Sequence, residues 1–312
     1  MPSAYFTHPA CRLHAMGPGH PECPERIDAI ADQLRASGLA DLIEQRQAPE
    51  ASLAQLQRAH DALLVAQIKD LSQQAEGSRH GLVQIDPDTA VNAHTWAAAL
   101  RAAGAAVAAT DAVLSGQVDT AFCAVRPPGH HACRSQAMGF CFFNNVAVAA
   151  LHALEAHGLE RVAIVDFDVH HGNGTEDIVA GDDRILMVSF FQHPLYPYSG
   201  TEPAAANLLN LPVAPYTRGP AIRELIERHW LPRLDAFAPE LMVISAGFDA
   251  HRDDELGQLG LVEADYAWIT EQLMAVARRH ARGRIVSSLE GGYHLGALAR
   301  SVQAHLRVLA GL

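Results

Sequence analysis

The stretch Ile164-Val-Asp-Phe-Asp-Val-His-His-Gly-Asn-Gly-Thr175 decides the fold, because it joins an apolar strand directly to a cluster of polar side chains. Residues 163–165 are apolar and mostly β-branched, as in a buried parallel strand. Asp166, Asp168 and His170 follow at alternate positions, and such side chains lie on one face of an extended chain. Buried carboxylates need a compensating charge. We therefore interpret this strand end as a metal site and not as a polar surface loop.

The same order of elements returns along the chain: an apolar strand, a polar loop that contains glycine, and a helix. Further strands are predicted at residues 4–7, 120–125, 185–190, 241–245 and 284–289. Helices are predicted at residues 25–37, 53–57, 61–75, 95–114, 175–179, 220–237 and 263–281, with two more that end near residues 157 and 309. The alternation of strands and helices favours one α/β domain with a largely parallel sheet.

Four of the predicted strands end in side chains with metal-binding or catalytic chemistry. These are His130 with His131, residues 166–171, Asp249, and Tyr293. Ligands of open α/β sheets lie outside the carboxyl ends of the strands. We therefore expect the four strand ends to meet along one edge of the sheet and to form a single site.

The metal chemistry follows from the residue types. A catalytic zinc ion usually has three protein ligands and one open position. Asp168 and His170 supply two ligands from one strand end, and Asp249 follows an apolar strand and a glycine as the natural third. Two carboxylates and one imidazole suit zinc, and they also suit ferrous iron. A metal held in this way makes bound water a nucleophile near neutral pH.

Hydrolysis also requires a base for the water proton and an acid for the leaving group. The adjacent His130 and His131 are the candidates, and Asp166 and Asn173 are available to hold their second ring nitrogens. Tyr293 lies on a Gly-Gly turn, where its hydroxyl can donate to a developing oxyanion. The pattern thus predicts metal-assisted hydrolysis of a carbonyl compound.

Composition narrows the class of protein. The 312 residues are 49% hydrophobic and 19% charged, which suits a globular protein with a large core. A net charge of −12 argues against nucleic acid and anionic membranes as partners, but it does not exclude a cationic substrate. The five cysteines form no Cys-x-x-Cys pair, the amino-terminal residues do not resemble a signal peptide, and the apolar run at 97–109 is too short to span a membrane. We expect a cytoplasmic protein.

Taken together, these motifs resemble those of the zinc-dependent histone deacetylases. The resemblance covers nearly the whole chain and rests on Arg126-Pro-Pro-Gly-His-His131, Asp166-Phe-Asp-Val-His-His-Gly-Asn-Gly-Thr175, Ser245-Ala-Gly-Phe-Asp249 and Glu290-Gly-Gly-Tyr293. The wider group includes bacterial histone deacetylase-like amidohydrolases, acetylpolyamine amidohydrolases and acetoin-utilisation proteins. The resemblance implies the arginase–deacetylase fold, with residues 1–312 forming one deacetylase domain around a parallel sheet of about eight strands flanked by helices.

The resemblance also implies roles for individual residues. Zinc is expected on Asp168, His170 and Asp249. The expected catalytic residues are His130 with its partner Asp166, His131 with its partner Asn173, and Tyr293 as the group that polarises the scissile carbonyl. The resemblance implies that His131 is the main proton shuttle and that His130 has a mainly electrostatic role. Class II-like members carry asparagine at the position of Asn173, whereas class I enzymes carry aspartate. A neutral asparagine raises the basicity of His131 less than a carboxylate would. A structural potassium ion is expected on Asp166, Ser189 and the backbone carbonyls of Asp168, His170 and Phe190.

The substrate tunnel is also implied by this resemblance. Its expected residues are Gly139, Phe140, Tyr196, Leu256 and either Asp86 or Asp88. Leu256 stands where acetylpolyamine-specific relatives often carry an acidic residue, although a shift by one position would place Glu255 there. Arg26 matches an internal arginine near the exit channel for acetate.

We therefore expect hydrolysis of the amide of N-acetyl- or N-acyl-lysine side chains in proteins or peptides, with release of acetate. The main alternative is a small-molecule amidohydrolase that acts on acetylpolyamines or other N-acyl amines. A catalytically silent module that binds acyl-lysine is disfavoured because Tyr293 and the zinc ligands are present. An arginase-like enzyme with two manganese ions is disfavoured because the strand ends offer one complete ligand set. His171 has no assigned role, and the oligomeric state stays open.

Overall fold

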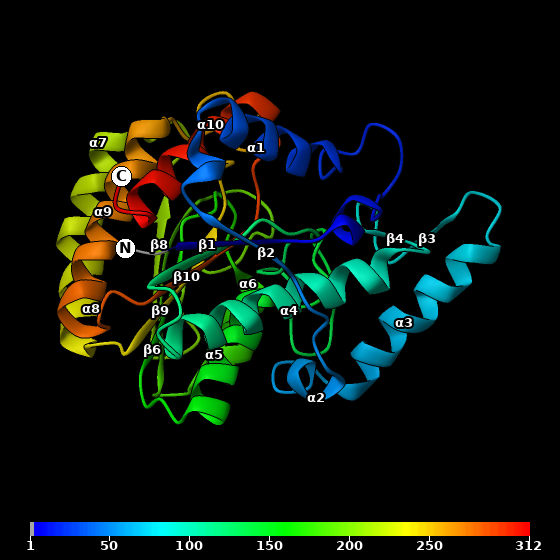
Figure 1. Cartoon of the computed structure of the whole chain (residues 1–312), viewed down its shortest axis with the longest axis horizontal. Helices are drawn as coiled ribbons and strands as arrows, with labels where there is room; N and C mark the ends of the chain where they lie inside the picture. The colour runs from blue at the N-terminus through cyan, green and yellow to red at the C-terminus, as the bar shows by residue number, and fades with distance from the viewer. Residues whose placement is uncertain (1–2) are drawn as a thin grey trace.

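The computed structural model describes residues 3–312, so the first two residues of the expected domain lie outside it. The chain forms a parallel eight-stranded sheet in the order β2-β1-β5-β10-β9-β6-β7-β8, with helices on both faces (Figure 1). The strands are β1 (Ser3–Thr7), β2 (Glu44–Gln47), β5 (Thr120–Cys123), β6 (Val162–Asp166), β7 (Ile185–Gln192), β8 (Leu208–Val213), β9 (Leu241–Ala246) and β10 (Ile285–Leu289). The predicted α/β domain with about eight parallel strands is confirmed.

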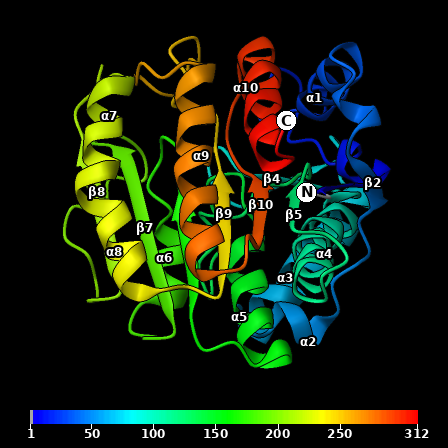
Figure 2. The ribbon, with the colours of Figure 1, turned by 60° about the vertical axis from the view of Figure 1, so that its left-hand side comes forward.

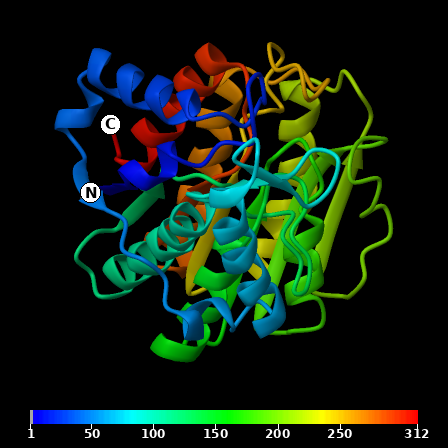
Figure 3. The ribbon, with the colours of Figure 1, turned by 90° about the vertical axis from the view of Figure 1, so that its right-hand side faces the viewer.

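The six strands predicted from the sequence form the middle of the sheet, whereas the two edge strands are not predicted. β2 has the polar sequence Glu-Gln-Arg-Gln and is mostly exposed, so it lacks the apolar residues that identify a buried strand. β8 contains Pro212, which an edge strand tolerates. A separate antiparallel hairpin, β3 (Leu82–Gln84) with β4 (Ala90–Asn92), surrounds the turn at 85–89 and is cyan in Figure 3.

Two hydrophobic cores form on opposite faces of the sheet, because adjacent strand residues point to opposite sides. Ile164 packs in one core and Val165 in the other. The first core is covered by α2 (Leu53–Leu56), α3 (Ala62–Gly77), α4 (Thr95–Leu114), α5 (Asn145–His157) and α6 (Asn173–Val179). The second is covered by α1 (Glu25–Ala36), α7 (Gly219–Leu225), α8 (Leu231–Phe237), α9 (Glu263–His280) and α10 (Leu295–Leu309). In Figure 2, α7 to α10 lie in front of the sheet, and α1 lies beside α10.

The apolar run at residues 97–109 lies within helix α4, which extends beyond it at both ends, so the prediction that this segment is too short to span a membrane is wrong for the helix as a whole. Within residues 3–312, α4 is the one helix whose length and hydropathy would suffice to cross a membrane. Its apolar window is 72% buried inside the fold, where it packs against α5 and β5. A side chain at Gly104 would overlap the backbone of Pro49, so the small residues of α4 allow close packing. The apolar residues of α4 therefore cover the sheet.

The helix predicted at residues 220–237 is divided into α7, a π-helical turn at Ile226–Trp230, and α8. Pro232 lies in the first turn of α8, and proline cannot donate the hydrogen bond that a continuous α-helix requires. A widened turn before a proline relieves this conflict, as in other π-bulges.

Strand order explains how the polar motifs meet. β5, β10, β9 and β6 are neighbours in the sheet, and all run in the same direction. Their carboxyl ends therefore lie side by side, although the chain visits them in a different order. The loops that follow them carry His130 and His131, Tyr293, Asp249, and residues 167–171, respectively, and Asp166 is the last residue of β6.

Candidate active site

Three predicted metal ligands converge at the carboxyl ends of β6 and β9. Nδ1 of His170 lies 3.1 Å from Oδ1 of Asp168 and 3.1 Å from Oδ2 of Asp249. The edge of a tetrahedron with metal–ligand bonds of 2.0–2.1 Å is about 3.3 Å, so these separations suit a zinc-sized ion. The second oxygens accept backbone N–H groups, from Gly291 to Asp168 at 2.9 Å and from Val169 to Asp249 at 3.0 Å. The backbone thus fixes both carboxylates.

Two glycines allow this close approach. A side chain at Gly247 would overlap the carboxyl group of Asp168, and a side chain at Gly291 would overlap that of Asp249. The motifs Ala-Gly-Phe-Asp and Glu-Gly-Gly-Tyr therefore require glycine for steric reasons at the metal site.

The charges around the three ligands favour a bound cation. Four carboxyl groups are buried in this region: Asp166, Asp168, Asp249 and Glu290. Burial, together with Asp168, raises the pKa of Asp249 to about 7, and burial raises the pKa of Glu290 to about 7. Both shifts reflect carboxylates that lack enough compensating positive charge. The residues present therefore fit a divalent metal ion.

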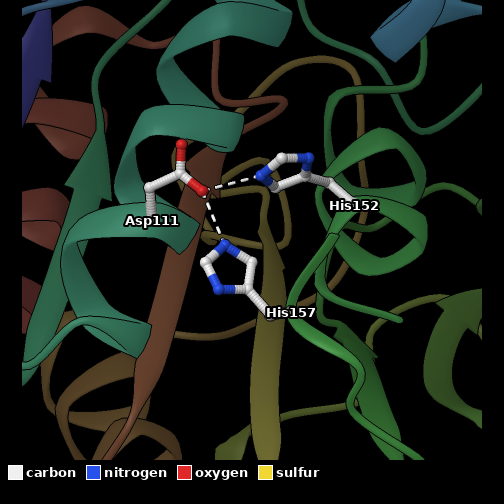
Figure 4. A group of neighbouring side chains, drawn as sticks. All are labelled: Asp111, His152 and His157. Atoms are coloured by element: carbon white, nitrogen blue, oxygen red, sulfur yellow. Dashed lines mark hydrogen bonds and ion pairs between the residues drawn. The ribbon is translucent and has the colours of Figure 1, made fainter. Parts of the chain in front are cut away.

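A second group of potential ligands, Asp111, His152 and His157, joins α4 to α5 (Figure 4). Nε2 of each histidine lies 2.7 Å from the same oxygen, Oδ1 of Asp111. A guanidinium nitrogen of Arg58 lies 2.7 Å from Nδ1 of His152. Because guanidinium groups only donate, Nδ1 accepts and Nε2 of His152 carries the proton that it donates to Asp111. We interpret this group as a hydrogen-bond cluster that ties the two helices together.

His130 and His131 lie side by side, with ring centroids 4.0 Å apart, and each contacts its predicted partner. Nδ1 of His131 lies 2.7 Å from the amide oxygen of Asn173, and Nδ1 of His130 lies 3.0 Å from Oδ2 of Asp166. An amide oxygen only accepts, so His131 carries a proton on Nδ1. In the neutral ring, Nε2 then has a free lone pair and is able to accept a proton.

The two histidines have opposite electrostatic environments. Burial, together with His130 and His170, lowers the pKa of His131 well below its usual value. Burial acts in the same direction on His130, but Asp168 and Asp166 outweigh it and raise the pKa of His130 well above its usual value. The two shifts favour the neutral form of His131 and the protonated form of His130.

Tyr293 follows β10 and lines the same pocket as His131. Burial raises the pKa of its hydroxyl group well above the usual value, so the group stays protonated and able to donate. Arg26 donates to the carbonyl oxygens of Gly292 at 2.7 Å and Glu290 at 2.5 Å, and its guanidinium carbon lies 5.0 Å from the centre of the Tyr293 ring. Arg26 thus supports the loop that carries Tyr293, and its place beside an acetate channel stays a prediction.

A pocket of about 210 Å³ leads to these side chains. It is lined by Asp88, His131, Gly139, Phe140, His170, Leu195, Tyr196, Tyr198, Leu256 and Tyr293. The rings of Tyr196 and His131 meet edge to face at 5.2 Å, and those of Phe140 and Tyr293 meet edge to face at 6.0 Å. A side chain at Gly139 would overlap the ring of His131. Both predicted aromatic walls therefore contact predicted catalytic residues.

The pocket distinguishes between residues that the sequence leaves as alternatives. Leu256 lines the pocket, whereas Glu255 lines an adjacent cavity. Asp88 also lines the pocket, whereas Asp86 accepts the backbone N–H groups of Asp88 and Thr89 at 3.0 and 2.6 Å. Asp86 thus stabilises the turn that presents Asp88.

Glu290 contributes to the site although the sequence gives it no role. One of its oxygens accepts the backbone N–H groups of Gly129 at 2.6 Å and His130 at 3.1 Å. Glu290 therefore fixes the loop of the two histidines from β10. Its place in the Glu-Gly-Gly-Tyr motif is the only signal in the sequence for this contact.

His171, left without a role by the sequence, anchors the loop that carries Tyr196. Its Nδ1 lies 3.0 Å from the hydroxyl oxygen of Ser199, and its Nε2 lies 3.1 Å from a carboxylate oxygen of Glu176. A side chain at Gly200 would overlap the ring of His171. His171 thus joins this loop to α6, and no sequence pattern pairs these distant positions.

The side chains predicted to bind potassium lie on neighbouring strands. Asp166 and Ser189 are register partners on β6 and β7, and both are buried. Oδ1 of Asp166 accepts the backbone N–H of Asp168 at 3.0 Å. The potassium site itself stays a prediction.

Glu22 holds two buried arginines near the site. Its carboxylate forms ion pairs with Arg126 and Arg26, and all three side chains are fully buried. Burial raises the pKa of Glu22, but Arg126 and Arg26 outweigh this effect and lower the pKa to about 2. The Glu22 carboxylate therefore holds the guanidinium group of Arg26, which in turn contacts the loop of Tyr293.

Glu22→Gln is expected to lower the free energy of unfolding by about 3–5 kcal/mol at pH 7, because two buried guanidinium groups lose their counter-charge. A carboxyl group with a lowered folded-state pKa stabilises the fold above its ordinary value of 4.5 and loses this effect as the pH falls towards 2. The difference between wild type and variant should therefore shrink on acidification. Urea unfolding at pH 7 and pH 3 tests this, with Glu25→Gln on the exposed surface as control. An unchanged stability at pH 7 would contradict the prediction.

Comparison with known proteins is consistent with this geometry. The family model for the histone deacetylase domain matches residues 20–309. The chain is 38% identical to a histone deacetylase-like amidohydrolase of Pseudomonas aeruginosa, over 93% of this chain and 81% of that relative. It is also 38% identical to the polyamine deacetylase HDAC10 of Mus musculus, over 93% of this chain but only 45% of that relative. The fold matches the crystal structure of the HDA15 HD domain with a TM-score of 0.93 and 33% identity, over 99% of this chain and 88% of that chain. The chain therefore belongs to the histone deacetylase family and is a hydrolytic deacetylase.

Proposed function

We propose that this deacetylase is zinc-dependent and hydrolyses the amide of N-acetyl- or other N-acyl-lysine side chains in proteins or peptides, with release of acetate or the corresponding acid. The observation that carries the proposal is the pocket of about 210 Å³, which combines aromatic walls with His131, His170 and Tyr293. Aromatic walls fit the alkyl chain of an acylated lysine, because acylation removes its positive charge.

Asp168, His170 and Asp249 are the residues that would hold the metal ion. Zinc supplies Lewis acidity when bound and makes water a nucleophile near neutral pH. The same donor set is compatible with ferrous iron. The buried excess of carboxylates supports a divalent ion at this place.

His131 accepts the proton of the attacking water on Nε2, because the contact with Asn173 keeps the proton of the neutral ring on Nδ1. The same imidazole then returns the proton to the amine nitrogen when the C–N bond breaks. His130, held by Asp166, stabilises the negative charge that develops nearby. The hydroxyl group of Tyr293 donates to the acyl oxygen in the transition state.

A structural potassium ion and a cytoplasmic location complete the proposal. The potassium ion is assigned to the side chains of Asp166 and Ser189 and the backbone carbonyls of Asp168, His170 and Phe190. These residues lie on β6 and β7 or directly after β6. The five cysteines are free thiols, which supports a reducing compartment.

A second candidate substrate is an acetylated polyamine or another small N-acyl amine. It is favoured by the name of the HDAC10 relatives and by the carboxylate of Asp88 in the pocket. The apolar Leu256 at the pocket favours the lysine substrate, because an alkyl side chain offers a polyamine cation no counter-charge.

A substrate panel decides between these candidates. We expect the zinc-loaded enzyme to hydrolyse an acetyl-lysine peptide with a kcat/KM at least about tenfold above that for N-acetylputrescine or an acetylspermidine, which corresponds to about 1.4 kcal/mol of transition-state discrimination. Acetate release measures all three reactions in the same way. A higher kcat/KM for the acetylated polyamines would contradict the proposed acyl-lysine substrate and would favour small N-acyl amines.

A further inference from the structure

Asp254 is a buried carboxyl group that the proposed reaction does not use directly. It lies in the loop after β9, five residues beyond Asp249, and is only 6% exposed. One oxygen accepts the backbone N–H groups of Tyr293 at 2.6 Å and His294 at 3.0 Å. The other oxygen accepts the N–H group of Leu256 at 3.1 Å. One side chain thus joins the Tyr293 loop to the loop that brings Leu256 to the pocket.

The contacts of Asp254 and Arg26 meet on a single peptide group. The carbonyl oxygen of Gly292 accepts from Nε of Arg26 at 2.7 Å, and the N–H group of Tyr293 donates to Asp254 at 2.6 Å. These two atoms belong to the same planar peptide unit. A buried cation therefore holds one side of this unit, and a buried anion holds the other.

The orientation of this peptide group depends on contacts with other segments, because the two residues before Tyr293 are glycines, which allow many backbone conformations. Gly291 and Gly292 precede Tyr293, and Gly292 has a φ angle of 118°, which favours glycine. A side chain at Gly291 would overlap Asp249, so glycine is required there for space. The loop therefore gains its fixed geometry from contacts with other segments and not from its own sequence.

We propose that Asp254 is a positioning residue for catalysis: with Arg26, it fixes the orientation of the Gly292–Tyr293 peptide group and so places the Tyr293 hydroxyl group at the acyl oxygen. This inference rests on the proposed function, in which Tyr293 stabilises the developing oxyanion. A displacement of about 1 Å at such a group can cost about a hundredfold in rate.

Asp254→Asn tests the proposal with little change in size. An amide has one acceptor oxygen and one donor NH₂ group, so at least one of the three backbone N–H groups must face another donor. We expect kcat to fall about ten- to a hundredfold, with KM changed by less than about threefold. Asp253→Asn is the matched control, because Asp253 is the exposed neighbour that pairs with Arg252 and Arg300 on the surface. It should retain wild-type kcat.

A double-mutant cycle with Tyr293→Phe distinguishes positioning from general structural support. If Asp254 acts through the hydroxyl group, Asp254→Asn should lower kcat by less than about twofold in the Tyr293→Phe background. A merely structural role would give losses that multiply, and this result would overturn the proposal. Wild-type kcat in Asp254→Asn would also overturn it, while a loss in Tyr293→Phe would leave the proposed function intact.

Amide hydrogen exchange gives a readout that does not depend on activity. Asp254→Ala removes both acceptor oxygens, so in this variant the amides of Tyr293 and His294 should lose protection while those of β10 keep it. Unchanged protection at Tyr293 would overturn the proposal, whether or not the wild type is active. Absence of deacylation by the wild type would refute the proposed function instead. If Asp254→Asn does not fold, Asp254→Glu is measured in the same cycle, because it retains the charge but shifts the acceptor oxygens.

Discussion

Tyr293→Phe is expected to lower kcat about a hundredfold or more, because the variant lacks only the hydroxyl group that donates to the developing oxyanion. The phenyl ring can keep its contacts with Phe140 and with the guanidinium group of Arg26. Metal content should therefore stay at one zinc ion per chain, and the melting temperature should change little. Steady-state kinetics on an acetyl-lysine peptide, combined with elemental analysis of the protein, measure both quantities.

Tyr216→Phe serves as the control for this variant, since Tyr216 is 74% exposed and lies outside the pocket. It should keep wild-type kcat. A Tyr293→Phe enzyme with full activity would remove Tyr293 from the proposed mechanism. Loss of zinc in that variant would show that the tyrosine acts on the metal site and not on the acyl oxygen.

Asp249→Ala is expected to lose the metal ion and, with it, the deacylation activity. The substitution leaves two of the three proposed ligands, and it also removes the acceptor for the N–H group of Val169 in the loop that carries Asp168 and His170. Metal content should fall from one zinc ion to well below one per chain after dialysis, and acetate release should fall to background. Elemental analysis and the peptide assay measure these outcomes on the same preparation.

His157→Ala is the matched control for metal loss. It alters the cluster of Asp111, His152 and His157, in which Arg58 directs a protonated Nε2 of His152 towards Asp111. The variant should therefore keep one zinc ion and wild-type activity. A wild-type content of two zinc ions that falls to one in His157→Ala would contradict the assignment of this cluster to hydrogen bonding.

The centre of the fold could be predicted because its strands carry a strong hydrophobic signal. Residues 162–166, 185–192 and 241–246 are fully buried, so their sequences are almost continuously apolar. The edge strands lack this signal: β2 is polar, and β8 contains proline and leaves several side chains partly exposed. Their positions depend on pairing with a neighbour that is distant in sequence, and periodicity carries no information about such pairing.

The site divides in the same way. Asp168, His170 and Asp249 could be identified because each follows an apolar strand, and parallel strands bring their carboxyl ends to one edge. Asp254 and Glu290 could not be given roles, because their partners are backbone N–H groups, which leave no trace in the residue pattern. The register between Leu256 and Glu255 likewise depends on loop geometry, which places Leu256 in the pocket.

Zinc titration of the metal-free protein tests the central claim most directly. Acetate release from an acetyl-lysine peptide should be absent before zinc is added, should rise in proportion to zinc, and should reach its maximum at one equivalent per chain. Asp249→Ala should show no rise over the same range. Deacylation at the wild-type rate by the metal-free protein, or a maximum reached only at two equivalents, would contradict hydrolysis at a single metal site formed by Asp168, His170 and Asp249.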